Sequence, residues 1–432
     1  SEDEGLAEIA LEAFESKLMK DTKLDDEDDE TEAIAKTFDE AIPLLPANLA
    51  VISVPGVYAT PLALNALSQG MNVHLFSDNV PIEDEVIMKD YARERGLIVM
   101  GPDCGTSIIS GIPICFANKI RKGNVGLIGA SGTGLQELST LIDSAGYGIT
   151  HAIGTGGRDL SSEINAKSTL IAISLLGNDP ETEIIALVSK PPSKTAEEFV
   201  IKTIEESGKP AVLAFLGSKS EKVSSKIFIA NTIEEAAAKT IALCKKENPT
   251  EETVIYERKP ISSSLFAEIK ALDKEQKIVK GLYTGGTLAS EAQFILQEHG
   301  HHIIDLGDDE YTRGNLHPMI DPSSRGIHIK DALSDPKTAV LLCDVVLGYG
   351  SHRDPAGVLS KDIIKAREET KSKAIAIASI IGTDDDPQKK QIQAKELEEA
   401  GIWVYPTNQF AAEIAKRIAE ILQNNRGMKT NE

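Results

Sequence analysis

The sequence predicts an α/β protein of three doubly wound domains with parallel sheets. Short apolar runs of strand length alternate with segments of helical periodicity along most of the chain, which is typical of βαβ units. The order of strand, glycine-containing turn and helix also recurs several times. The chain has 432 residues, of which 41% are hydrophobic, and this length suffices for two to four domains with sizeable cores.

Residues 1–46 are predicted to form an acidic helical leader and linker. Apolar residues at helical spacing predict an amphipathic helix over 5–19, and a run of six acidic residues follows at 25–30. A block of like charges repels itself and usually stays solvated, so no chemistry is expected in this segment.

The first α/β domain is expected over residues 47–123. The turn at Pro55-Gly56 separates the first strand from its helix, which is where folds of this kind bind ligands. The turn is not a complete GxGxxG motif, so this signal alone is weak. Strands are predicted at 49–54, 72–76 and 97–100, and helices at 60–69 and 89–95.

The second and third domains, over 124–245 and 278–425, are predicted to repeat one pattern. In each, a strand runs into a glycine-rich loop that is followed directly by a helix. The two strands are expected at 125–128 and 278–283, the loops at 129–134 and 284–287, and the helices at 135–145 and 288–297. Further strands are expected at 148–153, 184–188, 211–216, 339–346, 374–378 and 402–405, a connection at 246–277, a C-terminal helix at 409–422 and a tail at 426–432.

Two tripeptides, Ser131-Gly132-Thr133 and Gly285-Gly286-Thr287, take equivalent positions in this pattern. The first N–H groups of a helix lack intrahelical partners and carry partial positive charge, glycine lets an anion approach, and the hydroxyls add donors. The alternative is a tight turn with an ordinary Ser or Thr helix cap. The two equivalent loops, together with the glycine-rich segment 154–158, favour a phosphate-binding site at which two helix N-termini meet.

The charge and the cysteines of the chain exclude several classes of partner and site. The net charge is −22 and the pI is near 4.9, so neither nucleic acid nor an anionic membrane is expected as a partner. The four cysteines lack paired spacing, which indicates neither a zinc site nor a disulfide framework and favours a reducing compartment. No signal peptide and no membrane-spanning apolar run is visible, so a cytoplasmic location is expected.

A stretch rich in histidine and aspartate follows the helix predicted at 288–297. Its spacing matches no known ligand pattern, so no metal is expected. At the end of a strand such carboxylates either face a ligand or form part of an acidic surface, and both alternatives stay open. The residues concerned are His299, His301, His302, Asp305, Asp308 and Asp309. Serine-hydrolase, P-loop and zincin functions have no support, because no GxSxG, Walker A or HExxH sequence occurs.

Several longer motifs are specific. They are GPDCGT at 101–106, GASGTG at 129–134, THAIGTGGRDL at 150–160, YTGGTL at 283–288, IDLGDD at 304–309 and HPMIDP at 317–322. The first three resemble motifs of succinyl-CoA synthetase α subunits, and together the six resemble the FdrA family. The resemblance extends from about residue 47 to about residue 407.

The resemblance implies a Rossmann-like domain of CoA-binding type followed by two flavodoxin-like domains of the succinyl-CoA synthetase type. The last domain would carry a phosphate-facing loop at Gly348 and Gly350. In the synthetases a histidine of the α subunit carries phosphate, but no histidine occurs here between His151 and His299. No part of this chain resembles the ATP-grasp domain of the synthetase β subunit. Both departures argue against a complete, self-contained acyl-CoA synthetase.

FdrA-type proteins are associated with allantoin breakdown as a subunit of oxamate carbamoyltransferase, which interconverts oxalurate plus phosphate with oxamate plus carbamoyl phosphate. The resemblance therefore implies a subunit of a carbamoyl or acyl transferase that acts in an oligomer with other protein subunits. No cofactor is required in this chain, and CoA or phosphate is a candidate ligand. Two alternatives stay open: an acyl-CoA synthetase subunit with a separate ATP-grasp partner, and a non-catalytic scaffold that binds CoA or another metabolite.

Roles are predicted for individual residues within this function. His151 is the candidate acid–base group, with a hydrogen-bonding core histidine as the alternative, and Arg158 is an auxiliary charge. The expected small-molecule substrates are phosphate, carbamoyl phosphate, and oxamate or oxalurate or an acyl-CoA. The phosphate-binding candidates are Ser131, Gly132, Thr133, Gly285, Gly286, Thr287, Gly348 and Gly350. The substrate- or cofactor-binding candidates are Pro55, Gly56, Asp103, Cys104, Gly156, Gly157, Asp305, Asp308 and Asp309.

Overall fold

The computed structural model describes residues 35, 37–44, 47–217, 224–297 and 300–424. The chain divides into two compact units, residues 1–47 and 48–432. The first unit contains the short helix α2 (Phe38–Ala41), which the Thr37 hydroxyl caps by accepting a hydrogen bond from the Glu40 N–H. The helix predicted at 5–19 and the tail predicted at 426–432 lie outside the described residues.

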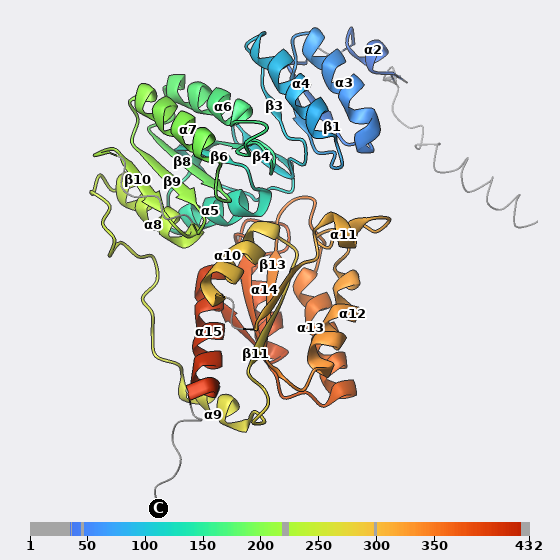
Figure 1. The fold of residues 1–432 in the computed structure, drawn as a ribbon, viewed down its shortest axis with the longest axis vertical. Coiled ribbons are helices and arrows are strands. Elements are labelled where there is room, and N and C mark those ends of the chain that lie inside the picture. The colour runs from blue at the N-terminus through green and yellow to red at the C-terminus, as the bar shows by residue number, and fades with distance from the viewer. Residues whose placement is uncertain (1–34, 36, 45–46, 218–223, 298–299, 425–432) are drawn as a thin grey trace, which may run out of the picture. The chain divides into compact units, whose positions relative to one another are not determined.

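The second unit begins with a three-stranded parallel sheet in the order β1-β2-β3 (Figure 1). The helix α3 follows β1 directly, so the turn at Pro55-Gly56 forms its N-terminus. The elements are β1 (Leu49–Ile52), α3 (Gly56–Ser68), β2 (Asn72–Leu75), α4 (Ile82–Arg93) and β3 (Val99–Met100).

A seven-stranded sheet follows in the order β10-β9-β8-β6-β7-β4-β5, and it is parallel except for β4, which is antiparallel to both of its neighbours. Its strands are β4 (Thr106–Ile109), β5 (Ile112–Cys115), β6 (Lys122–Gly129), β7 (Ile149–Gly154), β8 (Ile184–Ser189), β9 (Ala211–Phe215) and β10 (Ile227–Ala230). Its helices are α5 (Gly132–Ser144), α6 (Lys167–Asn178), α7 (Lys194–Ser207) and α8 (Ile233–Cys244).

The hairpin of β4 and β5 belongs to this second sheet, although residues 47–123 were predicted to form the first domain. The hairpin turns at Ser110-Gly111, and both residues have positive φ, 50° and 81°. Two successive positive φ values define the type I′ turn, which matches the twist of paired strands. The pairing of β4 with β7 therefore moves the boundary between the two sheets to an earlier point in the chain.

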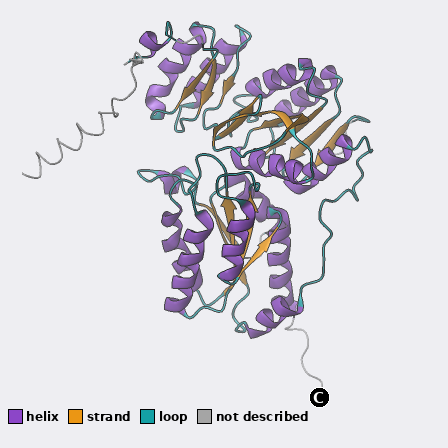
Figure 2. Ribbon diagram, turned by 180° about the vertical axis from the view of Figure 1, so that it is seen from behind, coloured by secondary structure: helices purple, strands orange, loops and turns teal. Residues whose placement is uncertain are grey.

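A five-stranded parallel sheet in the order β12-β11-β13-β14-β15 completes the second unit. In Figure 2 helices flank this sheet on both faces, with α12 and α13 on one side and α10 and α15 on the other. Its strands are β11 (Ile278–Tyr283), β12 (His302–Asp305), β13 (Thr338–Val346), β14 (Ile375–Ile381) and β15 (Ile402–Tyr405). The helices are α9 (Ser263–Ala271), which lies in the predicted connection, α10 (Gly286–Leu296), α11 (Asp309–Thr312), η1 (Pro322–Ser324), α12 (Arg325–Ser334), α13 (Pro355–Thr370), α14 (Lys390–Glu399) and α15 (Asn408–Asn424).

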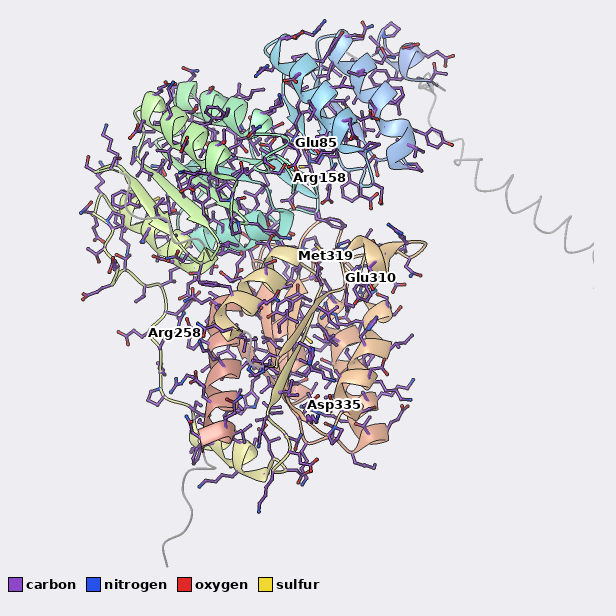
Figure 3. All side chains as sticks on the ribbon, viewed as in Figure 1. Glu85, Arg158, Arg258, Glu310, Met319 and Asp335 are labelled. Carbon is purple, nitrogen blue, oxygen red and sulfur yellow. The ribbon has the colours of Figure 1, made fainter. Side chains whose placement is uncertain are left out.

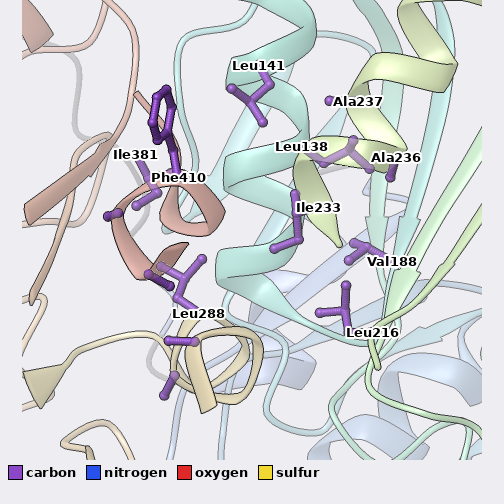
Figure 4. Packing of buried hydrophobic residues seen from close by; sticks show 14 of the residues in the cluster. Leu138, Leu141, Val188, Leu216, Ile233, Ala236, Ala237, Leu288, Ile381 and Phe410 are labelled. Carbon is purple, nitrogen blue, oxygen red and sulfur yellow. The ribbon is translucent and has the colours of Figure 1, made fainter. Parts of the chain in front are cut away.

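One hydrophobic core joins the seven-stranded and five-stranded sheets. Figure 4 shows Leu138 and Leu141 of α5 between Phe410 of α15 on one side and Ala236 of α8 on the other. Helix α5 also contacts α10 directly. Because α5 and α10 share this core, the loops that precede the two helices are held in a fixed relation. In the described part of the chain, no helix has both the length and the apolar character needed to cross a membrane.

Candidate functional site

The carboxyl-terminal ends of strands from all three sheets border one cleft of about 630 Å³. Parallel α/β sheets bind ligands outside these strand ends, because the loops and the helix N-termini meet there. The glycine loops 131–133 and 285–287 both line the cleft. The structure therefore brings together the two loops that the sequence pairs only by their position in a repeated pattern.

The capped N-terminus of helix α5 lies at the cleft. Helix α5 begins at Gly132 and not at 135 as predicted, so Gly132 and Thr133 lie in its first turn, where backbone amides lack intrahelical partners. The Ser131 hydroxyl caps the helix by accepting a hydrogen bond from the Gly134 N–H at 2.9 Å. The same hydroxyl lies 2.5 Å from the Thr287 hydroxyl of α10. The two helix N-termini are thus joined by a direct hydrogen bond.

The loop before α10 is held in a different way. The buried carboxylate of Asp344 on β13 accepts hydrogen bonds from the N–H groups of Thr284 (2.8 Å) and Gly285 (2.9 Å). Arg325 donates to the same carboxylate at 3.2 Å, and both side chains are almost fully buried. Burial raises the pKa of Asp344, while Arg325 and the loop amides act in the opposite direction. The amides of Thr284 and Gly285 are therefore occupied, and Gly286 and Thr287 of the first turn of α10 line the cleft.

Carboxylates surround the α10 end of the cleft. A Cβ built on Gly286 would lie 2.3 Å from Asp305 Oδ2, so the carboxylate lies directly against the helix N-terminus. Burial raises the pKa of Asp305 to about 6, with the Gly307 N–H opposing the shift by donating to Oδ1 at 2.9 Å. Asp308 also lines the cleft. Asp305 and Asp308 thus lie where carboxylates would face a ligand in the cleft, which is one of the two alternatives that the sequence left open.

The side chain of Lys190 also lines the cleft. It follows β8 and lowers the pKa of Asp305, although burial outweighs this effect. The carboxylates of Asp78 and Asp103 also line the cleft, with Asp103 in a left-handed backbone conformation (φ 55°). The cleft lining therefore combines two helix N-termini, one lysine and several carboxylates.

The sequence did not single out His317 as a site residue, yet His317 lines the cleft. Its ring packs against Phe116, with 5.7 Å between the ring centroids. Met319, two residues further along the chain, is labelled in Figure 3. Burial lowers the pKa of His317 to about 4, against an opposing effect of Asp78. The motif HPMIDP contains this histidine, so the sequence held a signal for it. The irregular turns on either side of it gave no basis for predicting that its side chain reaches the cleft.

The two residues predicted to be catalytic, His151 and Arg158, lie outside the lining of this cleft. The His151 ring accepts a hydrogen bond from the Ser110 N–H at Nδ1 (3.1 Å), and its Nε2 lies 3.8 Å from Asp179. His151 occurs within β7, three residues before the strand ends, whereas ligands bind beyond strand ends.

The other residue, Arg158, fastens α4 to the seven-stranded sheet. Figure 3 shows it beside Glu85, to which it donates at 2.9 Å, and it also donates to the Val80 carbonyl. The buried Lys89 pairs with the same Glu85 and with Asp159 at 2.7 Å. This network packs the first sheet against the second, so Arg158 is a structural residue in the described contacts.

The remaining candidates divide between the cleft and the packing around it. Pro55 and Gly157 line the cleft. A Cβ on Gly56 or Gly156 would lie within 2.4 Å of a backbone carbonyl, so both glycines permit close packing of chain segments. The Cys104 thiol is buried 3.4 Å from His74 Nε2, and burial raises its pKa to about 12, which leaves it protonated and unreactive.

The predicted phosphate-facing loop after β13 packs elsewhere. A Cβ on Gly348 would lie 2.5 Å from the Ala117 carbonyl, and Gly350 lies against Phe116. The Tyr349 N–H donates to the same carbonyl at 2.8 Å. Gly348 and Gly350 therefore allow this loop to pair with the segment after β5, and neither lines the cleft. The side chain of Asp309 lies outside the described residues.

The fold is α/β with mostly parallel sheets, and family models of the CoA-ligase type match two parts of it. A CoA-ligase family model matches residues 282–418, and a CoA binding domain model matches residues 120–217. The CoA binding domain match falls on the seven-stranded sheet and not on the predicted first domain, residues 47–123. A fold of CoA-binding type for residues 47–123 stays a prediction. The chain is 41% identical over 386 residues to the uncharacterized protein YahF of Escherichia coli (strain K12), covering 82% of this chain and 74% of YahF. It therefore belongs to the YahF family.

More distant similarity reaches the succinate–CoA ligases. The ADP-forming succinate–CoA ligase subunit alpha of Methanothermobacter thermautotrophicus is 23% identical over 241 residues, which cover 55% of this chain and 79% of the relative. Among solved structures, PH0766 from Pyrococcus horikoshii is 18% identical with a TM-score of 0.37, covering 87% of this chain and 84% of that chain. The dinucleotide-forming acetyl-coenzyme A synthetase 1 of Ca. Korarchaeum cryptofilum, with phosphate and ADP, is 16% identical with a TM-score of 0.38, covering 90% and 86%.

Proposed function

We propose that this chain is a subunit of an enzyme that transfers an activated acyl or carbamoyl group to or from phosphate. The observation that carries the proposal is the meeting of two helix N-termini, joined by the 2.5 Å contact between Ser131 and Thr287, at one cleft. Amides at such ends bind phosphate oxygens, and they stabilise negative charge that develops during acyl transfer.

The more specific proposal is oxamate carbamoyltransferase, which the resemblance to the FdrA family supports. In that reaction a phosphate oxygen forms a bond to the carbamoyl carbon of oxalurate, and the bond from that carbon to the amide nitrogen breaks. The leaving nitrogen takes up the proton that phosphate gives up, so the products are carbamoyl phosphate and oxamate. The α5 and α10 amides would hold the phosphate, and Lys190 would compensate part of its charge.

Within this proposal the carboxylates of the cleft have a separate task. Asp305 lies against the first residue of α10 and lines the cleft, and its raised pKa of about 6 places it near neutral pH. A carboxyl group in that range is suited to hold or release a proton near the leaving nitrogen. Asp305 therefore replaces His151 as the proposed acid–base group.

A second candidate function is an acyl-CoA ligase subunit that works with a separate nucleotide-binding partner. The matches to the CoA-ligase and CoA binding domain models favour it, as does the similarity to the alpha subunit of succinate–CoA ligase. Both candidates use an acyl phosphate held at the same cleft.

The test is an assay of the complex purified from its native cell, after mass spectrometry has identified the partner subunits. Carbamoyl phosphate formed from oxalurate and phosphate, without nucleotide or CoA, is the expected result. Thioester formed only with ATP, CoA and a carboxylic acid would favour the ligase. Binding of phosphate or CoA without turnover of either substrate set would indicate the scaffold.

A further inference from the structure

His317 lies at the point of the cleft where the α10 N-terminus meets the loop after β12. Its Nε2 lies 2.8 Å from the position that a Cβ on Gly307 would occupy. The Thr284 carbonyl oxygen lies 2.9 Å and Asp305 Oδ1 3.1 Å from that same position, so the imidazole, the carbonyl and the carboxylate surround the bare backbone of Gly307. His317, Asp305 and Gly307 all line the cleft.

The other ring nitrogen of His317 is already engaged. The Met319 N–H donates a hydrogen bond to Nδ1 at 3.2 Å. A backbone amide can only donate, so Nδ1 must present its lone pair to it. In a neutral imidazole one nitrogen carries the proton and the other accepts, which places the proton of His317 on Nε2. The Nε2–H is therefore a hydrogen-bond donor on the cleft side of the ring.

The charges around the ring do not reverse this assignment. The carboxylates that line the cleft together with His317 are those of Asp78, Asp103, Asp305 and Asp308, and a charged imidazole would be attracted to them. Burial of the ring, partly against Phe116, outweighs that attraction and lowers the pKa to about 4. At neutral pH the ring is uncharged, so its donor does not depend on protonation by solvent.

We propose that His317 donates its Nε2–H to an oxygen of the phosphate or acyl-phosphate ligand and does not itself carry phosphate. A phosphoryl acceptor needs a lone pair at the nitrogen that faces the ligand, and the Met319 amide fixes that lone pair on the far side of the ring. The donor adds to the first-turn amides of α10 at one end of the cleft. The identity of the ligand rests on the proposed function, whereas the position of the ring proton does not.

The ring proton can be measured directly by NMR of the full chain with 15N-labelled histidine at neutral pH. His317→Gln identifies the signals of His317 by their loss, and His151→Gln, outside the cleft, is the matched control that leaves them in place. The expected result is a neutral ring protonated at Nε2, whose signals shift when inorganic phosphate is added. A ring protonated at Nδ1, or a charged imidazolium at pH 7, would overturn the proposal.

Turnover by the purified complex gives a second measurement. His317→Phe keeps a ring against Phe116 but removes the donor, and a loss of about 100-fold in kcat is expected, as for other lost oxyanion donors. His317→Gln retains an N–H group and is expected to stay within about tenfold of the native enzyme. Equal activity of His317→Phe and native enzyme, or acid-labile phosphate on His317 after incubation with labelled substrate, would refute the role.

These outcomes separate two kinds of failure. If the complex turns over neither oxalurate nor an acyl-CoA substrate, the proposed function fails, and the NMR signals still decide the position of the ring proton. If turnover occurs but the ring carries its proton at Nδ1, the function stands and the donor role of His317 fails.

Discussion

The N-termini of α5 and α10 have similar sequences and unlike surroundings. Both follow a strand and a glycine-containing loop, and Ser131 and Thr287 touch across the cleft. The α5 end is capped by the hydroxyl of its own loop, whereas the α10 loop is fixed by Asp344 from β13 and bordered by Asp305. The backbone at the α5 end is thus held by its own loop, whereas the α10 end is held and bordered by residues from other strands.

This difference suggests a division of labour within the proposed site. Both helix ends would contact the phosphate, and its most negative oxygens are favoured at the α5 end, where Thr106 and Gln136 line the cleft. The carboxylates at the α10 end would border the acyl or carbamoyl portion bonded to that phosphate, or the leaving nitrogen.

The largest effect is expected from breaking the buried ion pair behind α10. Asp344→Ala leaves Arg325 buried without its carboxylate and frees the amides of Thr284 and Gly285, so the free energy of unfolding should fall by about 3–5 kcal/mol. Urea unfolding measures the loss, and hydrogen exchange of the β11–α10 peptides locates it. The free energy of unfolding of Asp344→Asn, which keeps one acceptor, should lie between those of Asp344→Ala and the native chain. An unchanged unfolding midpoint for Asp344→Ala would show that the ion pair does not hold the loop.

Side chains at the two first-turn glycines should reduce turnover unequally. A Cβ on Gly286 would lie 2.3 Å from Asp305, but a Cβ on Gly132 would lie 3.1 Å from the Thr106 hydroxyl, which can move more easily. Neither glycine has a positive φ, so the effect is steric. We expect Gly286→Val to lower kcat by 100-fold or more, about 3 kcal/mol, and Gly132→Val to lower it less. Melting curves must show that both variants are folded. If they are not, Gly132→Ala and Gly286→Ala are the milder substitutions to assay. Native turnover in both valine variants would show that these glycines are ordinary turn residues.

Both helices carry a buried glutamate, and these should make stability depend on pH. Burial raises the pKa of Glu137 on α5 and raises that of Glu291 on α10 to about 7. The folded state therefore binds protons more tightly than the unfolded state, so stability should fall as pH rises from about 4.5 to 7. Glu291→Gln should remove part of this fall, on the order of 1–3 kcal/mol, while Glu247→Gln on the exposed surface should not. Parallel pH profiles for the native chain and Glu291→Gln would contradict this account.

The smallest effect is expected at the α5 cap. Ser131→Ala removes the acceptor for the Gly134 N–H and the contact with Thr287, so it should lower the free energy of unfolding by about 1 kcal/mol. Thr287→Ala removes only the contact between the helices and should cost less. Denaturation curves of the two variants, compared with Asp344→Ala, test whether the α10 end depends on buried charge and the α5 end does not. Equal losses for Ser131→Ala and Asp344→Ala would abolish the distinction.

The sequence predicted most of the parallel strands and the two glycine loops before α5 and α10, because apolar runs and glycine loops are local signals, but it did not predict β4, β5, β10 or β12. It could not predict Asp344, whose hydrogen bonds reach a loop 60 residues earlier in the chain. His317 was missed because the turns around it have no periodicity that places it beside β12. His151, predicted as the acid–base group, lies within a strand and not beyond its end. The hairpin at Ser110-Gly111 had a turn signal that a search for βαβ units does not detect.

A crystal structure of the chain determined with phosphate tests whether the two helix ends form one phosphate site. We expect one phosphate within hydrogen-bonding distance of the Gly132 and Thr133 amides, with the Ser131 and Thr287 hydroxyls still in contact beneath it. A cleft that stays empty at saturating phosphate, or α5 and α10 ends that lie apart and face bulk solvent, would contradict the shared phosphate site.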